Sequence, residues 1–349
     1  MTAKPAGKDK PALRGFDKDL AELEELALSF RAGAPLIDEG VRRIQKALAH
    51  KNNFLVSKAA KLVAEAELAE LLPEVLAAYD RFFVDAASTD PQCWAKTALA
   101  KALVKLEHRQ KDAFLHGLRH IQLEGSWGGS TDTAGALRAN CLHGLLDCPG
   151  LSDAELLAYL AESLVDADKT VRMEAARAIG NVGGVSSALL LRLRLHLGLE
   201  RRNHEEEEPE VLGACFSALL SLEGERAVPL VASALKEGDE LSAEAAYALA
   251  EARTPAAWLA LQQRWRAGAD AWFASVLLSA MALTRLSEAL DFLIAMIEND
   301  AREAPAAIEA IARSAPGEEL CFRIRRTVEQ TGSPRLQKAL AEHLPSVRN

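Results

Sequence analysis

Two sets of basic residues recur at matching positions in successive alanine-rich segments of the chain. The first basic column consists of Lys96, Arg138 and Arg172. The second basic column lies five residues later in the same segments and starts one segment earlier, and it consists of Lys61, Lys101, His143 and Arg177. Basic side chains bind carboxylates and phosphates through charge-assisted hydrogen bonds. The two columns therefore predict a surface that binds acidic groups of a partner.

Short motifs for catalysis or metal binding are missing from the sequence. It contains no GxSxG, HExxH or DxDxDG pattern and no glycine-rich loop that follows a strand. His116 and His120 are four residues apart, but no third metal ligand lies near them in the sequence. The five cysteines form no CxxC pair, which favours reduced, structural thiols. We expect no catalytic residue, no metal and no cofactor, and hence a protein that is not an enzyme.

A possible aromatic patch consists of Trp127, Tyr247 and Trp272. Trp127 lies in the stretch LEGSWGGSTDTAG, which is too rich in glycine and serine to be helical throughout. Its indole either binds a partner or folds back over a groove between helices. Tyr247 and Trp272 lie among several other aromatic residues, so packing between adjacent helices is their alternative role. Tryptophan and tyrosine are enriched at interfaces, and the three residues are candidate contacts.

The alanine-rich segments themselves indicate the architecture. Each has a central apolar residue at helical spacing from small residues, and these anchors are Val63, Leu103, Leu145, Ile179, Leu219, Leu249, Met281, Ile311 and Leu340. Leucine-rich amphipathic stretches alternate with them, which indicates helix pairs. One pair cannot bury its apolar face alone and must stack on its neighbours, and alanine lets the helices approach closely. We predict an all-α fold, an α-solenoid that stacks about nine antiparallel helix pairs into a superhelix, with no strands.

One segment carries a family resemblance. Residues 166–180 combine an acidic turn, Val-Arg, Ala-Ala and Ala-Ile-Gly, and they resemble a HEAT repeat. The shorter spacing near the C-terminus resembles the HEAT-like repeats of phycobilisome (PBS) lyases, and the likeness extends over about residues 35–345. It implies that the second helix of each pair lines a concave face. It also implies a structural alternative for Arg172, which can pair with the turn aspartates Asp166 or Asp168.

The predicted organisation is a single array. Residues 1–16 form a disordered leader, residues 17–349 form one solenoid, and residues 17–34 are its N-terminal capping helix, followed by repeats over 35–345. No apolar run is long enough to cross a membrane, and no secretory signal is seen, so a cytoplasmic location is expected.

Charge and resemblance together give the expected function. The 349 residues carry a net charge of -9, which argues against a nucleic-acid partner. Both basic columns lose their charge in the fifth to seventh helix pairs, and the last two pairs place Glu309 and Lys338, opposite in sign, in the second column. We expect a non-enzymatic HEAT-like scaffold whose concave face binds a protein or peptide, with acidic groups over its N-terminal half.

The alternatives are enzymes with a HEAT-like fold. A DNA-binding glycosylase of alkylated bases would use a basic cleft with tryptophans, to which the columns and Trp94 bear some likeness. A protein similar to chromophore lyases is the other alternative. HEAT-like hydroxylases of deoxyhypusine bind iron through repeated His-Glu pairs, whereas this chain has a single one, His204-Glu205. The resemblance therefore argues against that reaction.

Overall fold

The computed structural model describes residues 15–200 and 208–344. These residues divide into two compact units, unit 1 up to Leu156 and unit 2 from Leu157, and the boundary falls within helix α9 (Asp153–Ser163). Most of the predicted leader and the His204-Glu205 pair lie outside the described residues. The prediction of one continuous array over 17–349 stays a prediction.

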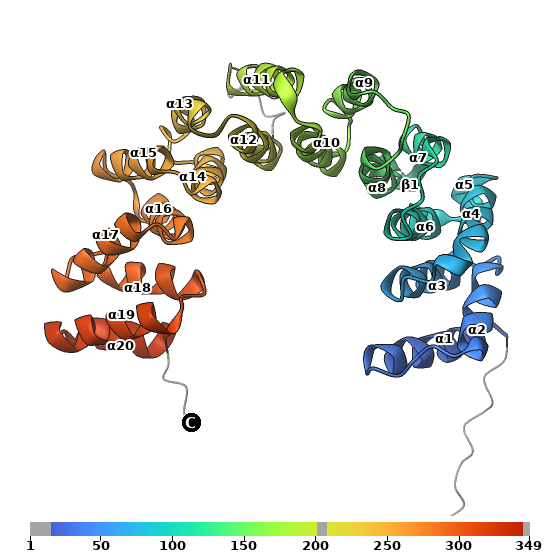
Figure 1. Ribbon diagram of the computed structural model, residues 1–349, viewed down its shortest axis with the longest axis horizontal. Coiled ribbons are helices and arrows are strands. Elements are labelled where there is room, and N and C mark those ends of the chain that lie inside the picture. The colour runs from blue at the N-terminus through green and yellow to red at the C-terminus, as the bar shows by residue number, and fades with distance from the viewer. Residues whose placement is uncertain (1–14, 201–207, 345–349) are drawn as a thin grey trace, which may run out of the picture. The chain divides into compact units, whose positions relative to one another are not determined.

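Unit 1 consists of helices and one β-hairpin. Its helices are α1 (Phe16–Arg31), α2 (Asp38–Leu48), α3 (Asn53–Glu65), α4 (Leu72–Arg81), α5 (Ala86–Thr89), α6 (Trp94–Lys105), α7 (Lys111–Leu118) and α8 (Gly135–Leu146). Short 3-10 turns, Ala69–Leu71 and Pro91–Cys93, precede α4 and α6. Helices α3, α6 and α8 form one layer and α2, α4 and α7 the other (Figure 1).

Unit 2 is entirely helical in its described residues. Its helices are α10 (Lys169–Val182), α11 (Gly184–Glu200), α12 (Pro209–Glu223), α13 (Val228–Ser233), α14 (Glu240–Ala252), α15 (Pro255–Arg266), α16 (Ala271–Thr284), α17 (Ser287–Glu298), α18 (Ala304–Arg313), α19 (Glu318–Thr331) and α20 (Pro334–His343). A 3-10 turn, Gly224–Arg226, precedes α13. The even-numbered helices pack against one another in order, α10 on α12 through α18 on α20.

The predicted all-α fold of stacked helix pairs is confirmed. In unit 1 α3 packs on α6 and α6 packs on α8, while α2, α4 and α7 each pack against one of these helices. The alanines that the sequence singled out face the contacts, since Ala175, Ala176 and Ala178 are all fully buried. A Cβ atom on Gly180 would lie 3.0 Å from the Cβ of Ala218 on α12, so these two helices approach as closely as small side chains permit.

Side chains at the helix starts explain where many of these helices begin. Asp168, Asp239 and Asp270 each accept a hydrogen bond from a backbone N–H in the first turn of α10, α14 and α16. Asn52 does the same for α3. Such caps satisfy N–H groups that have no partner within the helix, and they stabilise it by about 1 kcal/mol.

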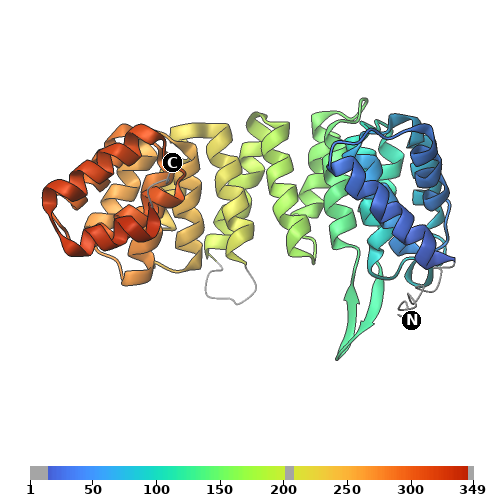
Figure 2. The same cartoon turned by 90° about the horizontal axis from the view of Figure 1, so that it is seen from below.

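The Gly/Ser-rich stretch forms a hairpin, so the expectation of no strands is wrong there. Strands β1 (Leu123–Ser126) and β2 (Gly129–Asp132) pair antiparallel, with Ser126 opposite Gly129. Gly128 in the two-residue loop has φ +94°, a conformation that glycine adopts freely. Figure 2 shows the hairpin projecting beyond the ends of the helices of unit 1. Trp127 at its tip is 108% exposed, so it does not fold back over a groove.

All five cysteines are free thiols, as the spacing predicted. Cys93, Cys141, Cys148 and Cys215 are buried, and Cys321 is half-buried. Burial raises the pKa of Cys93 to about 11 and that of Cys141 to about 12. The two thiols are therefore protonated at neutral pH and serve as small apolar side chains in the core.

Candidate ligand-binding groove

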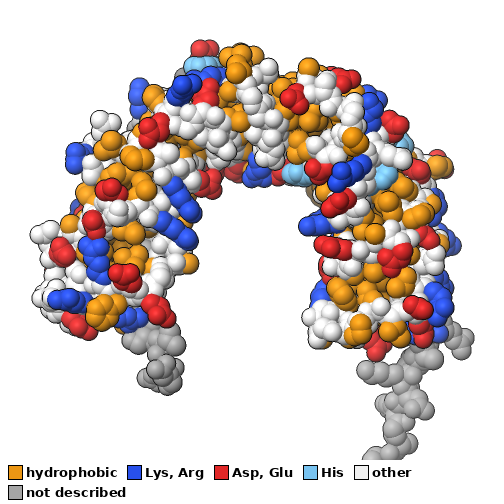
Figure 3. Space-filling model, viewed as in Figure 1, with side chains coloured by type: hydrophobic (Ala, Val, Ile, Leu, Met, Phe, Trp, Pro, Cys, Tyr) orange, Lys and Arg blue, Asp and Glu red, His pale blue; other side chains and the backbone are white. Residues whose placement is uncertain are grey.

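A groove of about 840 Å³ runs over the layer formed by α3, α6 and α8 in unit 1. We call it the basic groove because three lysines line it: Lys61 from α3, and Lys101 and Lys105 from α6. All three side chains are exposed. Lys and Arg side chains are visible at this edge of unit 1, beside α3 and α6 (Figure 3). The second basic column thus contributes Lys61 and Lys101, and Lys105 was not among the predicted site residues.

The three lysines form no ion pair within the described part of the chain. No described carboxylate lies within 4 Å of any of their ammonium groups. The carboxylate of Glu65 also lines the groove, but it accepts two hydrogen bonds from Arg31, at 2.9 and 2.8 Å. Its charge is therefore matched by another residue, and the groove keeps an excess of positive charge. Such a surface attracts carboxylates or phosphates.

The opposite end of the basic groove is aromatic. Phe54 lies in the first turn of α3 and Trp94 is the first residue of α6, and their ring centroids are 5.7 Å apart at a tilt of 59°. Trp94 is 51% exposed, which is unusual for a side chain of its size. Lys58 lies over the Phe54 ring at 5.3 Å and pairs with Glu24. The groove therefore offers apolar surface at the helix starts and positive charge two turns further along.

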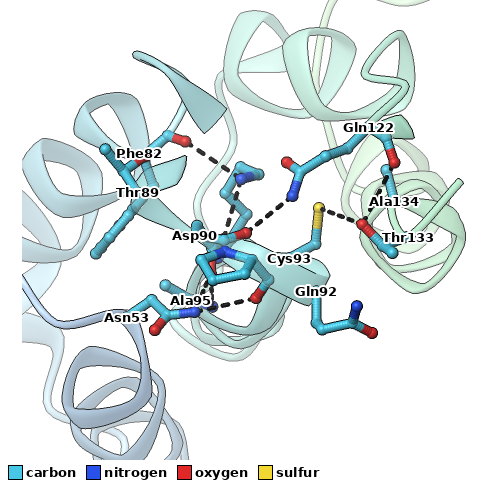
Figure 4. A network of polar contacts seen from close by, with 12 residues as sticks. Asn53, Phe82, Thr89, Asp90, Gln92, Cys93, Ala95, Gln122, Thr133 and Ala134 are labelled. Atoms are coloured by element: carbon cyan, nitrogen blue, oxygen red, sulfur yellow. Dashed lines mark hydrogen bonds and ion pairs between the residues drawn. The ribbon is translucent and has the colours of Figure 1, made fainter. Parts of the chain in front are cut away.

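A buried polar network fixes the start of α6 (Figure 4). Trp94 is the first residue of this helix. The carboxylate of Asp90 is fully buried and accepts hydrogen bonds at 2.9 Å from the backbone N–H groups of Ala95 and Lys96. It also accepts one at 3.0 Å from the side-chain amide of Asn53, which ties α3 to α6. The Lys96 ammonium lies 3.0 Å from Asp90 Oδ2 and donates to the carbonyl of Phe82.

The backbone between Asp90 and Trp94 is strained. Gln92 and Cys93 have φ values of 64° and 51°, which lie in the left-handed region that side chains other than glycine disfavour. Two such residues in sequence persist only when their surroundings over-determine them, and strain of this kind concentrates at functional sites. Here the Asp90 network holds one side of the turn.

The hairpin holds the other side. Glu124 of β1 accepts a hydrogen bond of 2.7 Å from the backbone N–H of Gln92 and one of 3.2 Å from its side-chain amide. It also accepts from Gln122 and Thr133 at the base of the hairpin. Burial opposes ionisation of Glu124, but these hydrogen bonds together lower its pKa below the usual value. Because Gln92 lines the basic groove, the base of the hairpin supports its aromatic end.

Two residues of the first basic column are not on a binding surface, and their prediction as partner contacts is wrong. Lys96 is 0% exposed and Arg138 is 4% exposed. Arg138 donates to Asp132 at 2.6 Å and to the carbonyl of His120 at 3.0 Å. Each cation reaches back to carbonyl oxygens that precede its own helix. The physical reason is the free hydrogen-bonding capacity of those carbonyls, which a long basic side chain satisfies.

Arg172 repeats the same contact in unit 2. It donates to the carbonyls of Asp166 and Ala167, at 2.6 and 2.9 Å, and pairs with Glu208. The structural alternative for Arg172 is therefore the correct one, although the partner in the turn is the backbone of Asp166 and not its carboxylate. All three side chains of the first basic column therefore bind the backbone that precedes their own helix.

The remaining predicted residues do not gather in one place. His143 on α8 is half-buried and does not line the basic groove. Arg177 belongs to unit 2, where it is exposed and pairs with Glu174. Of the aromatic candidates, Tyr247 lines a groove of unit 2, Trp272 is 49% exposed on α16, and Trp127 is at the hairpin tip. The basic groove therefore unites Lys61 and Lys101 alone among the predicted residues.

A groove of unit 2 has the opposite character. It lies over α10, α12 and α14, has a volume of about 500 Å³, and is lined by Glu210, Glu244 and Glu251 together with Arg177. Burial raises the pKa of Glu244, and the neighbouring Glu210 and Glu251 raise it further. Gly213 makes room for this side chain, because a Cβ there would lie 2.2 Å from Glu244 Oε2. We call it the acidic groove.

Two further observations concern the described residues as a whole. None of their helices is both long and apolar enough to cross a bilayer. In the same residues, no three or more His, Cys, Asp or Glu side chains are grouped so that they could hold a metal ion.

Comparison with known proteins gives structural matches alone. No family model matches the sequence, and the search of curated proteins finds no match. Human deoxyhypusine hydroxylase in complex with glycerol matches at 17% identity over 77% of this chain and 97% of that chain, with a TM-score of 0.28. The complex of CpcE and CpcF of phycocyanin lyase from Nostoc sp. matches at 15% identity over 93% and 99%, with a TM-score of 0.38. An engineered protein matches at 16% identity over 94% and 93%, with a TM-score of 0.33.

These matches correct one prediction. Two of the three structures belong to enzymes, a hydroxylase and a lyase, which contradicts the prediction that a chain with this fold is not an enzyme. The low identities and TM-scores assign neither reaction to this chain. The chain is a protein of stacked helix pairs, and a fold alone does not define a function.

Proposed function

We propose that this chain is a HEAT-like repeat protein that binds an acidic segment of a partner protein in the basic groove of unit 1. The observation that carries the proposal is the set of three exposed lysines, Lys61, Lys101 and Lys105, that share one groove without an ion-pair partner among the described residues. In a chain with a net charge of -9, a local excess of positive charge selects an acidic ligand.

A protein segment fits this groove better than nucleic acid does. Duplex DNA needs many phosphate contacts, and these supply most of its affinity. The basic groove offers three lysines, and the surface around unit 1 carries carboxylates such as Glu65 and Glu124. An acidic peptide can pair a few carboxylates with the lysines. Unlike duplex DNA, it does not bring many further negative charges close to the carboxylates of the surrounding surface.

The test is a titration with a fluorescein-labelled oligo-glutamate peptide, followed by fluorescence anisotropy. The full chain should bind it saturably and bind an oligo-serine peptide of equal length at least tenfold more weakly. The triple variant Lys61→Glu, Lys101→Glu, Lys105→Glu should lose the binding. The matched control reverses three exposed lysines elsewhere, Lys51, Lys236 and Lys338, which changes the net charge equally.

Two results would overturn the proposal. One is equal binding by the groove variant and the control variant, because the three lysines would then play no specific part. The other is retention of duplex DNA at physiological salt with no binding of the oligo-glutamate peptide. Circular dichroism of all variants shows whether the helices are intact.

A further inference from the structure

The basic groove has two chemically different ends at a matched spacing on both helices. Phe54 and Lys61 are seven residues apart on α3, and Trp94 and Lys101 are seven apart on α6. Seven residues are two helical turns, so each aromatic residue shares a face with its lysine at a distance of about 10 Å along the axis. Lys105 lies one further turn along. A ligand that follows the helices therefore meets a pair of rings first and a group of ammonium ions next.

The rings are held in place before any ligand arrives. Trp94 follows the strained residues Gln92 and Cys93, and the start of α6 is fixed by the carboxylate of Asp90. Glu124 from the hairpin fixes Gln92 through two hydrogen bonds. A site whose groups are already ordered loses less conformational entropy on binding, so preorganisation raises affinity. The network thus maintains a half-exposed indole next to Phe54 at the edge of a groove.

We propose that the basic groove recognises an acidic segment that also carries one large apolar side chain, received against Phe54 and Trp94. The inference rests on the proposed function and specifies its ligand. An extended chain advances about 3.3 Å per residue, so 10 Å correspond to about three residues. The ligand therefore has a leucine-sized or aromatic anchor about three residues away from its first acidic side chain, and further acidic residues beyond it.

The experiment compares labelled peptides that differ at the anchor alone. One peptide has leucine, two serines and a run of glutamates, one has the same residues in reverse order, and one has serine in place of leucine. Burying a leucine contributes about 1.5–3 kcal/mol, and 1.4 kcal/mol is tenfold in affinity. We expect at least one leucine-containing order to bind about tenfold or more tightly than the serine peptide. The two orders also show in which direction the ligand lies.

Variants then locate the anchor. Trp94→Ala should abolish the advantage of the leucine peptide, so that the leucine and serine peptides bind this variant with equal affinity. Trp272→Ala, which removes a similarly exposed indole from unit 2, should change neither. A second readout needs no variant of Trp94. The leucine peptide contains no tryptophan, so any indole emission comes from the protein. Because the leucine side chain covers Trp94, binding should shift this emission to shorter wavelength. The serine peptide should not produce this shift.

The outcomes separate this inference from the proposed function. Equal affinity of the leucine and serine peptides, with no shift in emission, contradicts the proposed apolar anchor but not the proposed binding of an acidic ligand. An advantage of leucine that persists in Trp94→Ala also overturns it, because the anchor would then bind elsewhere. Absence of binding by every glutamate peptide overturns the proposed function itself.

Discussion

Basic side chains at equivalent positions in this chain have two different roles, and burial distinguishes them. Lys96, Arg138 and Arg172 reach back to carbonyl oxygens before their own helices and are buried or nearly so. Lys61 and Lys101, at the second position, extend into the basic groove. The sequence spacing identified both sets, but it did not distinguish them. The carbonyls that recruit the first set become available only when the preceding turn is folded.

Lys96 should therefore contribute to stability and Lys101 should not. Lys96→Met leaves Asp90 buried without its counter-ion, and loss of one partner of a buried pair costs about 3–5 kcal/mol. Lys101→Met removes an exposed charge and should change the free energy of unfolding by less than about 0.5 kcal/mol. Urea unfolding followed by circular dichroism measures both. Equal effects of the two substitutions would contradict the structural role, and Asp90→Asn combined with Lys96→Met should recover part of the loss.

Glu244 in the acidic groove should make stability depend on pH. Burial, and then Glu210 and Glu251, raise its pKa in the folded protein. A carboxyl whose folded pKa is above its unfolded value favours folding when protonated, and that contribution is lost as pH rises through the folded pKa. Glu244→Gln should therefore raise the midpoint of unfolding at pH 7, and the gain should disappear below about pH 4. An equal gain from the exposed Glu237→Gln would show that net charge alone is responsible.

At the scale of the elements, the helices follow from the sequence and the hairpin does not. Alanine spacing and capping residues place the second helix of each pair, because these signals are local. The strands have short, glycine-rich sequences with little preference for β structure. Contacts between residues distant in sequence hold them, such as Gln92 with Glu124 and the carbonyl of Asp90 with Gln122. Likewise, Trp94 and Lys105 become groove residues only when α3, α6 and α8 lie side by side, which the sequence spacing does not show.

The base of the hairpin should matter more to the groove than its tip. Glu124→Ala removes the acceptor for Gln92, Gln122 and Thr133 and releases the strained turn before Trp94. It should lower the free energy of unfolding of the chain. It should also lower the affinity for the leucine-containing peptide more than the affinity for the serine peptide. Trp127→Ala removes an indole without packing contacts and should change the free energy of unfolding by less than about 0.5 kcal/mol. Urea unfolding and peptide titration of both variants test this, and indistinguishable variants would contradict the bracing role of Glu124.

At the scale of the whole chain, local and overall charge oppose each other. The net charge is -9, while the basic groove attracts anions, and acidic and basic side chains are interspersed over the visible surface (Figure 3). An acidic ligand is therefore repelled at long range and attracted at short range. The range of the repulsion is set by salt, because the Debye length falls from about 30 Å at 0.01 M to about 8 Å at 0.15 M.

This balance predicts an uneven response to salt. Between 0.01 and 0.15 M, screening removes repulsion by distant carboxylates together with part of the attraction, so the affinity for the oligo-glutamate peptide should change little. Between 0.15 and 1 M the Debye length shrinks to about 3 Å, and the affinity should fall steeply as the lysines themselves are screened. Peptide titration at several salt concentrations measures this. A straight log-log line over the whole range would show that the overall charge has no influence.

Each groove depends on a few consecutive helices, and this has an evolutionary consequence. Helix α6 packs on α3 and α8, and α12 packs on α10 and α14, so a helix of the stack mainly touches its immediate neighbours. Substitutions that convert one groove from attracting acids to attracting bases therefore leave distant grooves intact. A chain of this kind can exchange one recognition property at a time under selection, and a protein engineer can do the same.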